Sequence, residues 1–154
     1  MEGRVRCWRC WLIVVTLGVA AFGLFLVVAP NLGRQLFGLL IYGSRSGIDE
    51  LGTSATPYIT MVHGVLGAVM FGWAIALLFI AVKPFGRGSW DAWLTLSVSL
   101  AAWFVPDTVF SIWTGFWPNA VLNLVLVILF AIPLAATFRS FKKRTPNRHI
   151  ERTE

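Results

Sequence analysis

The chain has 154 residues, of which 57% are hydrophobic and only 13% are charged, with a formal net charge of +6. Soluble domains contain about 25% charged residues, so this composition excludes an ordinary water-soluble protein. The length allows a single domain over residues 1–154.

Four apolar segments follow one another along the chain. Each approaches the ~20 residues that a helix needs to cross a hydrocarbon core of ~30 Å, and helices satisfy their own backbone groups in lipid. The sequence therefore predicts an all-α fold, a bundle of four transmembrane helices. The predicted spans are 11–29, 57–82, 90–110 and 118–138.

The first span ends in a sequence that resembles a signal-peptide cleavage site. Its apolar run of 19 residues is longer than the 7–15 residues typical of a signal peptide, and Pro30 would directly follow the cut. We therefore expect the first span to be retained.

The first loop, residues 30–56, is the longest connection. Its part 32–42 is mostly apolar, with Arg34 as its one charge, and is too short to span, which suits a half-helix lying in the membrane interface. Residues 43–54 are rich in Gly and Ser and typical of an irregular loop. Thr56 and Pro57 predict the N-cap and first turn of the second span.

Lys and Arg concentrate on one side of this predicted topology. The N-terminal flank, the second loop and the tail 139–154 carry 11 of the 13 basic residues. The positive-inside rule therefore predicts cytoplasmic termini and an extracytoplasmic first loop. The expected location is the inner or plasma membrane of the cell. The basic tail is expected to meet anionic lipid headgroups, and no nucleic-acid partner is expected.

Small residues recur every four positions in the second span. Such stripes let helix backbones approach closely in lipid. We expect this one to pack within the monomer, against the first span near Thr16, Ala20 and Gly23; a homodimer seam is the alternative. The stripe consists of Gly64, Ala68, Gly72 and Ala76.

Two prolines interrupt the third and fourth spans. Pro106 and Pro133 each lack an amide donor, which frees the carbonyls four residues earlier, on Ala102 and Leu129.

Polar side chains gather at one predicted depth, near the extracytoplasmic ends of the last three spans. Asp91 and Asp107 are 16 residues apart, about 24 Å along a helix, which places Asp107 just below the outer headgroups. Asp107 and His63 are the candidate carboxylate–imidazole pair. The cluster consists of His63, Asp107, Ser111, Asn119 and Asn123, with Trp103 as the candidate floor of a pocket.

Three interpretations of the cluster stay open. It can be a structural hydrogen-bond network, a pocket for a ligand or lipid headgroup, or part of a path for protons or solutes, because polar groups in lipid need partners or a use. Its shallow depth disfavours transport, since coupling-ion sites usually lie near the bilayer midplane.

The remaining motifs carry no specific chemistry. Cys7 and Cys10 have C-x-x-C spacing, but they lie outside any thioredoxin-like context, and His149 is the only further candidate zinc ligand on that side. No catalytic motif or metal site is expected. No resident cofactor is expected either, and a bound quinone or lipid is left open.

The predicted architecture resembles the small DoxX-like bacterial membrane proteins. Residues 103–111, Trp-Phe-Val-Pro-Asp-Thr-Val-Phe-Ser, are also similar to a Trp-Phe-x-x-Asp-Thr-x-x-Ser pattern of four-helix relatives. The resemblance covers about residues 11–138. It implies a four-helix fold and a link to quinone or thiol redox chemistry, although no redox motif of that group falls on a position here.

The sequence is thus interpreted as a multi-pass membrane protein that binds a lipid or small amphiphile without catalysis, or serves as a subunit of a larger complex. One alternative is a quinone- or thiol-redox-linked membrane enzyme subunit. Another is a small proton-coupled transporter.

Overall fold

The computed structural model describes residues 2–43, 52 and 55–142. These residues form only helices, turns and short connections, which confirms the predicted all-α class. Most of the loop predicted over 43–54, and the tail beyond residue 142, lie outside the described residues. The elements are α1 (Glu2–Val28), α2 (Pro30–Tyr42), α3 (Ala55–Val82), the 3-10 turn η2 (Phe85–Arg87), α4 (Trp90–Trp113) and α5 (Trp117–Lys142).

Four of these helices, α1, α3, α4 and α5, are long and apolar enough to cross a membrane. The chain is therefore a multi-pass integral membrane protein, as predicted. The observed helices extend beyond the predicted spans, because α1 begins at Glu2 and α4 continues to Trp113. Apolar windows detect only the part of a helix that lies in hydrocarbon, and the helical backbone continues into the interface.

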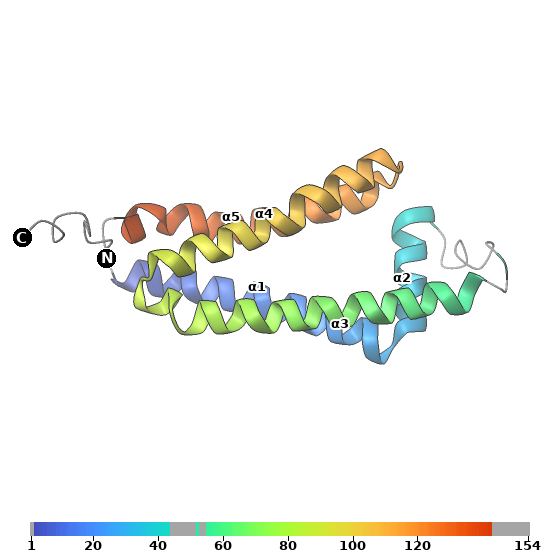
Figure 1. Ribbon diagram of the computed structural model, residues 1–154, viewed down its shortest axis with the longest axis horizontal. Helices are drawn as coiled ribbons and strands as arrows, with labels where there is room; N and C mark the ends of the chain where they lie inside the picture. Colours follow the sequence, from blue (N-terminus) through green and yellow to red (C-terminus); the bar gives the residue numbers. More distant parts are fainter. Residues whose placement is uncertain (1, 44–51, 53–54, 143–154) are drawn as a thin grey trace, which may run out of the picture.

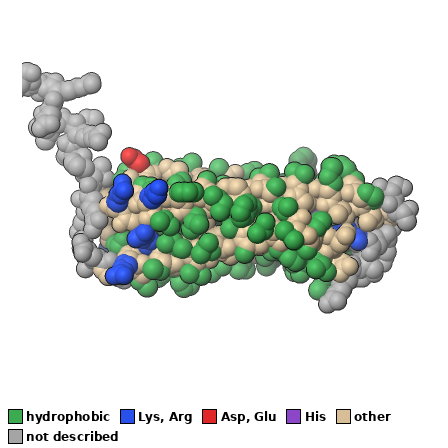
Figure 2. Space-filling view, turned by 90° about the horizontal axis from the view of Figure 1, so that it is seen from below, with side chains coloured by type: hydrophobic (Ala, Val, Ile, Leu, Met, Phe, Trp, Pro, Cys, Tyr) green, Lys and Arg blue, Asp and Glu red, His purple; other side chains and the backbone are tan. Residues whose placement is uncertain are grey.

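The helices form two antiparallel pairs (Figure 1). α1 lies beside α3, and α4 lies beside α5; the pairs meet at the end that holds the N-terminus and η2 and diverge toward the other end. We call the end that holds the N-terminus and η2 the basic end, because Lys and Arg gather there (Figure 2). Hydrophobic side chains cover the length of the bundle in the same view. The other end of the bundle is the α2 end.

The half-helix predicted in the first loop is α2, which crosses between the two pairs (Figure 1). Pro30 occupies its first turn, where the missing N–H costs nothing. Gly43 ends the helix at φ 69, a left-handed conformation that suits glycine, and donates its N–H to the carbonyl of Leu39. At its end, the ring of Tyr42 lies 6.4 Å from that of Phe116, beside the α4–α5 turn.

The start of α3 differs by a residue or two from the prediction. The helix begins at Ala55, so Thr56 lies inside its first turn instead of capping it. The Thr56 hydroxyl instead donates to the carbonyl of Gly52 at 3.3 Å.

The helices α1 and α3 pack most closely where two glycines meet. A Cβ atom on Gly67 would lie 2.5 Å from the carbonyl oxygen of Gly23, and one on Gly23 would lie 2.8 Å from that of Gly67. Gly23 was expected at this contact, whereas Gly67 was not. The buried face of α3 continues along Ala74, Leu77 and Ala81.

The predicted packing stripe is therefore wrong for this contact. Ala68, Gly72 and Ala76 are exposed, Gly64 is half-buried, and a Cβ on Gly64 or Gly72 would meet nothing within 4 Å. The reason is geometric. A four-residue step advances about 40° around a helix, so the stripe drifts about 120° over three steps, whereas a seven-residue step, as between positions 67, 74 and 81, drifts only about 20°.

The basic end is the tightly packed end of the bundle. The rings of Phe85 and Phe141 lie 4.6 Å apart and are both essentially inaccessible. Arg9 donates from Nη2 to the carbonyl of Val82 at 2.7 Å, which satisfies a carbonyl at the end of α3.

Candidate functional site

A cavity of about 680 Å³ occupies the half of the bundle near the α2 end. All five α-helices contribute to its wall, and most of that wall is apolar. The volume lies within the range of roughly 300–1,000 Å³ that is usual for small-molecule sites. The divergence of the two helix pairs thus creates a chamber of ligand size.

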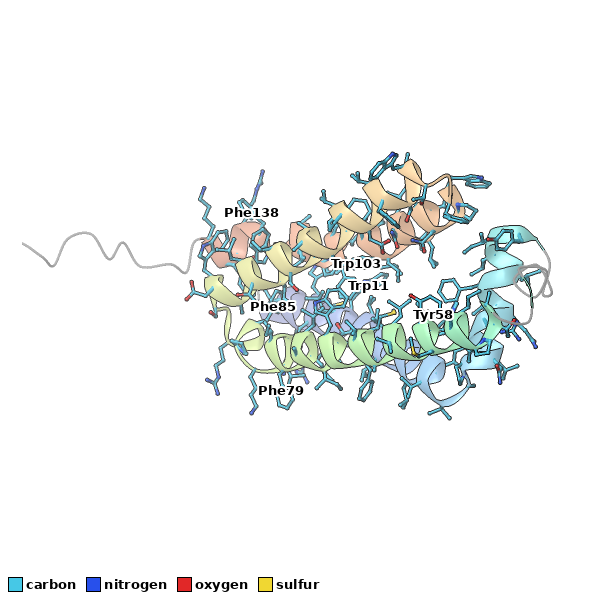
Figure 3. The ribbon with its side chains drawn as sticks, turned by 45° about the vertical axis from the view of Figure 1, so that its right-hand side comes forward. Trp11, Tyr58, Phe79, Phe85, Trp103 and Phe138 are labelled. Atoms are coloured by element: carbon cyan, nitrogen blue, oxygen red, sulfur yellow. The ribbon has the colours of Figure 1, made fainter. Side chains whose placement is uncertain are left out.

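The floor of the cavity lies near the middle of the bundle. Trp73 of α3 donates from Nε1 to the hydroxyl of Ser99 on α4 at 2.8 Å, and its ring lies 5.7 Å from that of Trp103. Trp103, expected as a pocket floor, does line the cavity, and Figure 3 shows it between the two helix pairs.

Asp107, Ser111 and Asn119 form a hydrogen-bonded cluster toward the α2 end. Asn119 of α5 donates from Nδ2 to the Asp107 carboxylate oxygen Oδ1 at 3.1 Å and to the Ser111 hydroxyl at 2.8 Å. The Ser111 hydroxyl donates to the Asp107 backbone carbonyl at 2.7 Å and lies 3.4 Å from its Oδ1. The i, i+4 spacing on α4 places both acceptors on the face toward α5.

Asn123 lies one turn deeper on α5 and is almost fully buried, with 2% of its surface exposed. Its Nδ2 has one long contact, 3.5 Å, to the Thr108 hydroxyl. Asp107, Asn119 and Asn123 all line the cavity, whereas buried Ser111 lies behind them.

The structure gives His63 other partners than Asp107. Its Nδ1 lies 2.7 Å from the carbonyl of Ile59, one turn earlier on α3, so this nitrogen carries the hydrogen. Its ring meets that of Phe37 on α2 edge to face, with centroids 4.9 Å apart. His63 therefore contacts α2 from α3. His63 and Asp107, which are both described, do not form the expected carboxylate–imidazole pair.

The hydrogen bond between Trp73 and Ser99 at the floor was not predicted from the sequence. Trp73 and Ser99 lie in the middle of apolar spans, and no motif marks them. A signal was present, because an indole N–H at that depth needs an acceptor, and Ser99 supplies one on a neighbouring helix.

The two cysteines form no disulfide with each other. Cys7 and Cys10 are exposed free thiols on α1, and no group of three or more metal-ligating side chains occurs among the described residues.

Comparison with protein-family models, curated proteins and solved structures gave no significant match. The DoxX-like resemblance therefore stays a prediction.

Proposed function

We propose that this membrane protein binds a lipid or another small amphiphile in the cavity and acts as a non-catalytic binding module or complex subunit. One observation carries the proposal: a chamber of about 680 Å³ with mostly apolar walls has its carboxylate and amides together toward one end. An apolar chamber with a few convergent polar groups is the usual form of a site for a partly polar ligand.

The depth of the cluster supports an amphiphile. Asp107 lies six residues before Trp113, the last residue of α4, which corresponds to about 9 Å along the helix. A polar head held there stays near the membrane interface. The apolar part of the ligand extends toward the floor at Trp73 and Ser99. Ser99 lies about 12 Å from Asp107 along α4.

A lateral route from the bilayer into the cavity supports the same proposal. α3 and α4 meet near Trp73 and Ser99 and separate beyond them (Figure 1). The cavity-lining residues Leu66 and Val69 of α3, and Ala102 and Pro106 of α4, are exposed. An amphiphile can therefore enter between these helices without leaving the membrane.

The charge distribution favours the α2 end as the extracytoplasmic end. Six of the described Lys and Arg residues flank the spans at the basic end, namely Arg6, Arg9, Lys83, Arg87, Arg139 and Lys142, whereas Arg34 lies on α2. The positive-inside rule then directs the basic end to the cytoplasm, and the cavity takes its ligand from the outer leaflet.

A matched pair of substitutions tests the proposal. Ala102→Phe puts a ring into the cavity wall, whereas Ala101→Phe puts the same ring on an exposed neighbour outside the cavity lining. Lipids that remain bound after gentle detergent extraction are identified by mass spectrometry. Wild type and Ala101→Phe are expected to retain the same amphiphile, and Ala102→Phe to lose it. Equal retention by both variants, or none by the wild type, would overturn the proposal.

A further inference from the structure

We propose that the head group of the bound amphiphile is a primary ammonium, as in an aminophospholipid such as phosphatidylethanolamine. This inference rests on the proposed function and names the chemical class of its ligand. Three cavity-lining residues, Asp107, Asn119 and Asn123, provide the recognition.

The hydrogen-bond inventory of these residues leaves mostly acceptors for a ligand. Asn119 uses both amide hydrogens on Asp107 and Ser111, and the Ser111 hydroxyl donates to the Asp107 backbone. Among the described residues, no donor bonds to Oδ2 of Asp107 or to the amide oxygens of Asn119 and Asn123. The site thus has three free acceptor oxygens and only one free donor hydrogen. This hydrogen is on the Asn123 amide, whose other hydrogen faces the Thr108 hydroxyl.

The burial of Asn123 makes this imbalance significant. A residue with 2% of its surface exposed cannot turn its amide oxygen to bulk water, and a buried acceptor without a donor is costly. Asn123 lines the cavity, so this oxygen is open to the cavity and is not enclosed by protein atoms on all sides. A ligand in the cavity is therefore placed to donate a hydrogen bond to the Asn123 amide oxygen.

The charge of the site points the same way. Asp107 supplies a carboxylate at membrane depth, and no Lys, Arg or His is among the described residues that line the cavity. Acidic side chains within membrane spans are costly and usually have a partner. An ammonium within the head group would give Asp107 a cationic partner and supply the missing donors.

A primary ammonium fits both requirements. It carries one positive charge and three N–H donors. These match the Asp107 carboxylate and three free acceptor oxygens, of which one belongs to that carboxylate. A quaternary choline head has the charge without a donor. A phosphoglycerol head has hydroxyl donors with a net negative charge, and an oxidised quinone presents only acceptors.

Competition between lipids with matched acyl chains tests the inference. The full-length protein is reconstituted in nanodiscs that contain equal amounts of phosphatidylethanolamine, phosphatidylcholine and phosphatidylglycerol, and its bound lipids are counted by native mass spectrometry. We expect phosphatidylethanolamine to exceed each of the others by about tenfold, the factor that one charge-assisted hydrogen bond provides. This comparison uses the wild-type protein alone and is therefore independent of any effect that substitutions have on folding.

Two variants assign the preference to the site. Asp107→Asn is expected to remove the preference for phosphatidylethanolamine, whereas Asp91→Asn, on an exposed residue in the first turn of the same helix, keeps it. Asn123→Leu is expected to reduce the preference as well.

The outcomes separate this inference from the proposed function. Equal binding of phosphatidylethanolamine and phosphatidylcholine, with both lost in Ala102→Phe, overturns the ammonium assignment and leaves amphiphile binding standing. A preference for phosphatidylglycerol, or an ethanolamine preference that survives in Asp107→Asn, also overturns the assignment. If no lipid is retained by the wild type, both proposals fail.

Discussion

Trp11 donates from its indole Nε1 to the backbone carbonyl of Leu129 at 2.8 Å. This is the carbonyl that Pro133, lacking an N–H, leaves without its helical donor. The indole of Trp11 on α1 therefore supplies the donor that the Leu129 carbonyl on α5 lacks, although the two residues are 118 positions apart in sequence. It also joins the two helix pairs, because α1 belongs to one and α5 to the other.

Trp11→Phe is expected to lower the free energy of unfolding by about 1 kcal/mol, within the range of hydrogen bonds measured in membrane proteins. Pro133→Ala restores an N–H for the Leu129 carbonyl, so Trp11→Phe should cost less in that background. Unfolding in mixed detergent–SDS micelles measures all four corners of this cycle. An unchanged cost in the Pro133→Ala background would show that the indole acts only by packing.

Asn119→Asp is expected to destabilise the α2 end of the α4–α5 pair more than Asn119→Ala does. It replaces the Nδ2 donor, 3.1 Å from the Asp107 carboxylate, by an acidic oxygen. Two carboxylates at that distance cannot both ionise without strong repulsion. The double variant Asp107→Asn with Asn119→Asp re-creates an acid–amide pair and should recover most of the lost stability. Thermal unfolding in detergent provides the comparison, and failure of this rescue would contradict the direct pairing.

Gly67→Ala is expected to cost about 1–3 kcal/mol, because the new methyl group would meet the backbone of Gly23 and must push α1 away from α3. Gly64→Ala is the matched control one turn earlier on α3, where a Cβ meets nothing within 4 Å. We expect this control to unfold at the wild-type temperature or above it, since Ala favours a helix over Gly. Equal destabilisation by both substitutions would contradict the assigned packing face.

Ser99→Ala is expected to weaken the floor of the cavity. It removes the acceptor of the Trp73 indole, the hydrogen bond at which α3 and α4 meet in the middle of the bundle. The cost should be about 1 kcal/mol, and lipid should gain access between the two helix pairs. Hydrogen exchange of α3 and α4 in nanodiscs detects the change, with Ser97→Ala as control, because the Ser97 hydroxyl bonds within its own helix to Trp93.

The sequence predicted the features that depend on the membrane alone. Apolar length indicated the four spans, and the short apolar stretch after Pro30 indicated α2. Helical spacing and depth indicated that Asp107, Ser111, Asn119 and Asn123 share one region. These inferences need only the rise of a helix and the thickness of a bilayer.

The features that depend on how each helix is rotated could not be read from the sequence. The rotation of α3 is set by the close approach of Gly23 and Gly67, which directs Gly64 and Gly72 away from α1. The same rotation turns His63 toward Phe37 of α2 instead of Asp107. Depth could thus be predicted from one helix at a time, whereas pairing required the packing of two.

The divergence of the helix pairs has a mechanical consequence for the bilayer. The two helix pairs lie close together at the basic end and apart at the α2 end (Figure 1). A bundle of this shape that spans a bilayer takes up more area in the leaflet at the α2 end. A wedge of this shape deforms the bilayer least where the leaflet at its wide end is expanded. We therefore expect the protein to concentrate in membrane regions that curve outward at the α2 end, and to do so less when Ala102→Phe leaves the chamber empty of lipid.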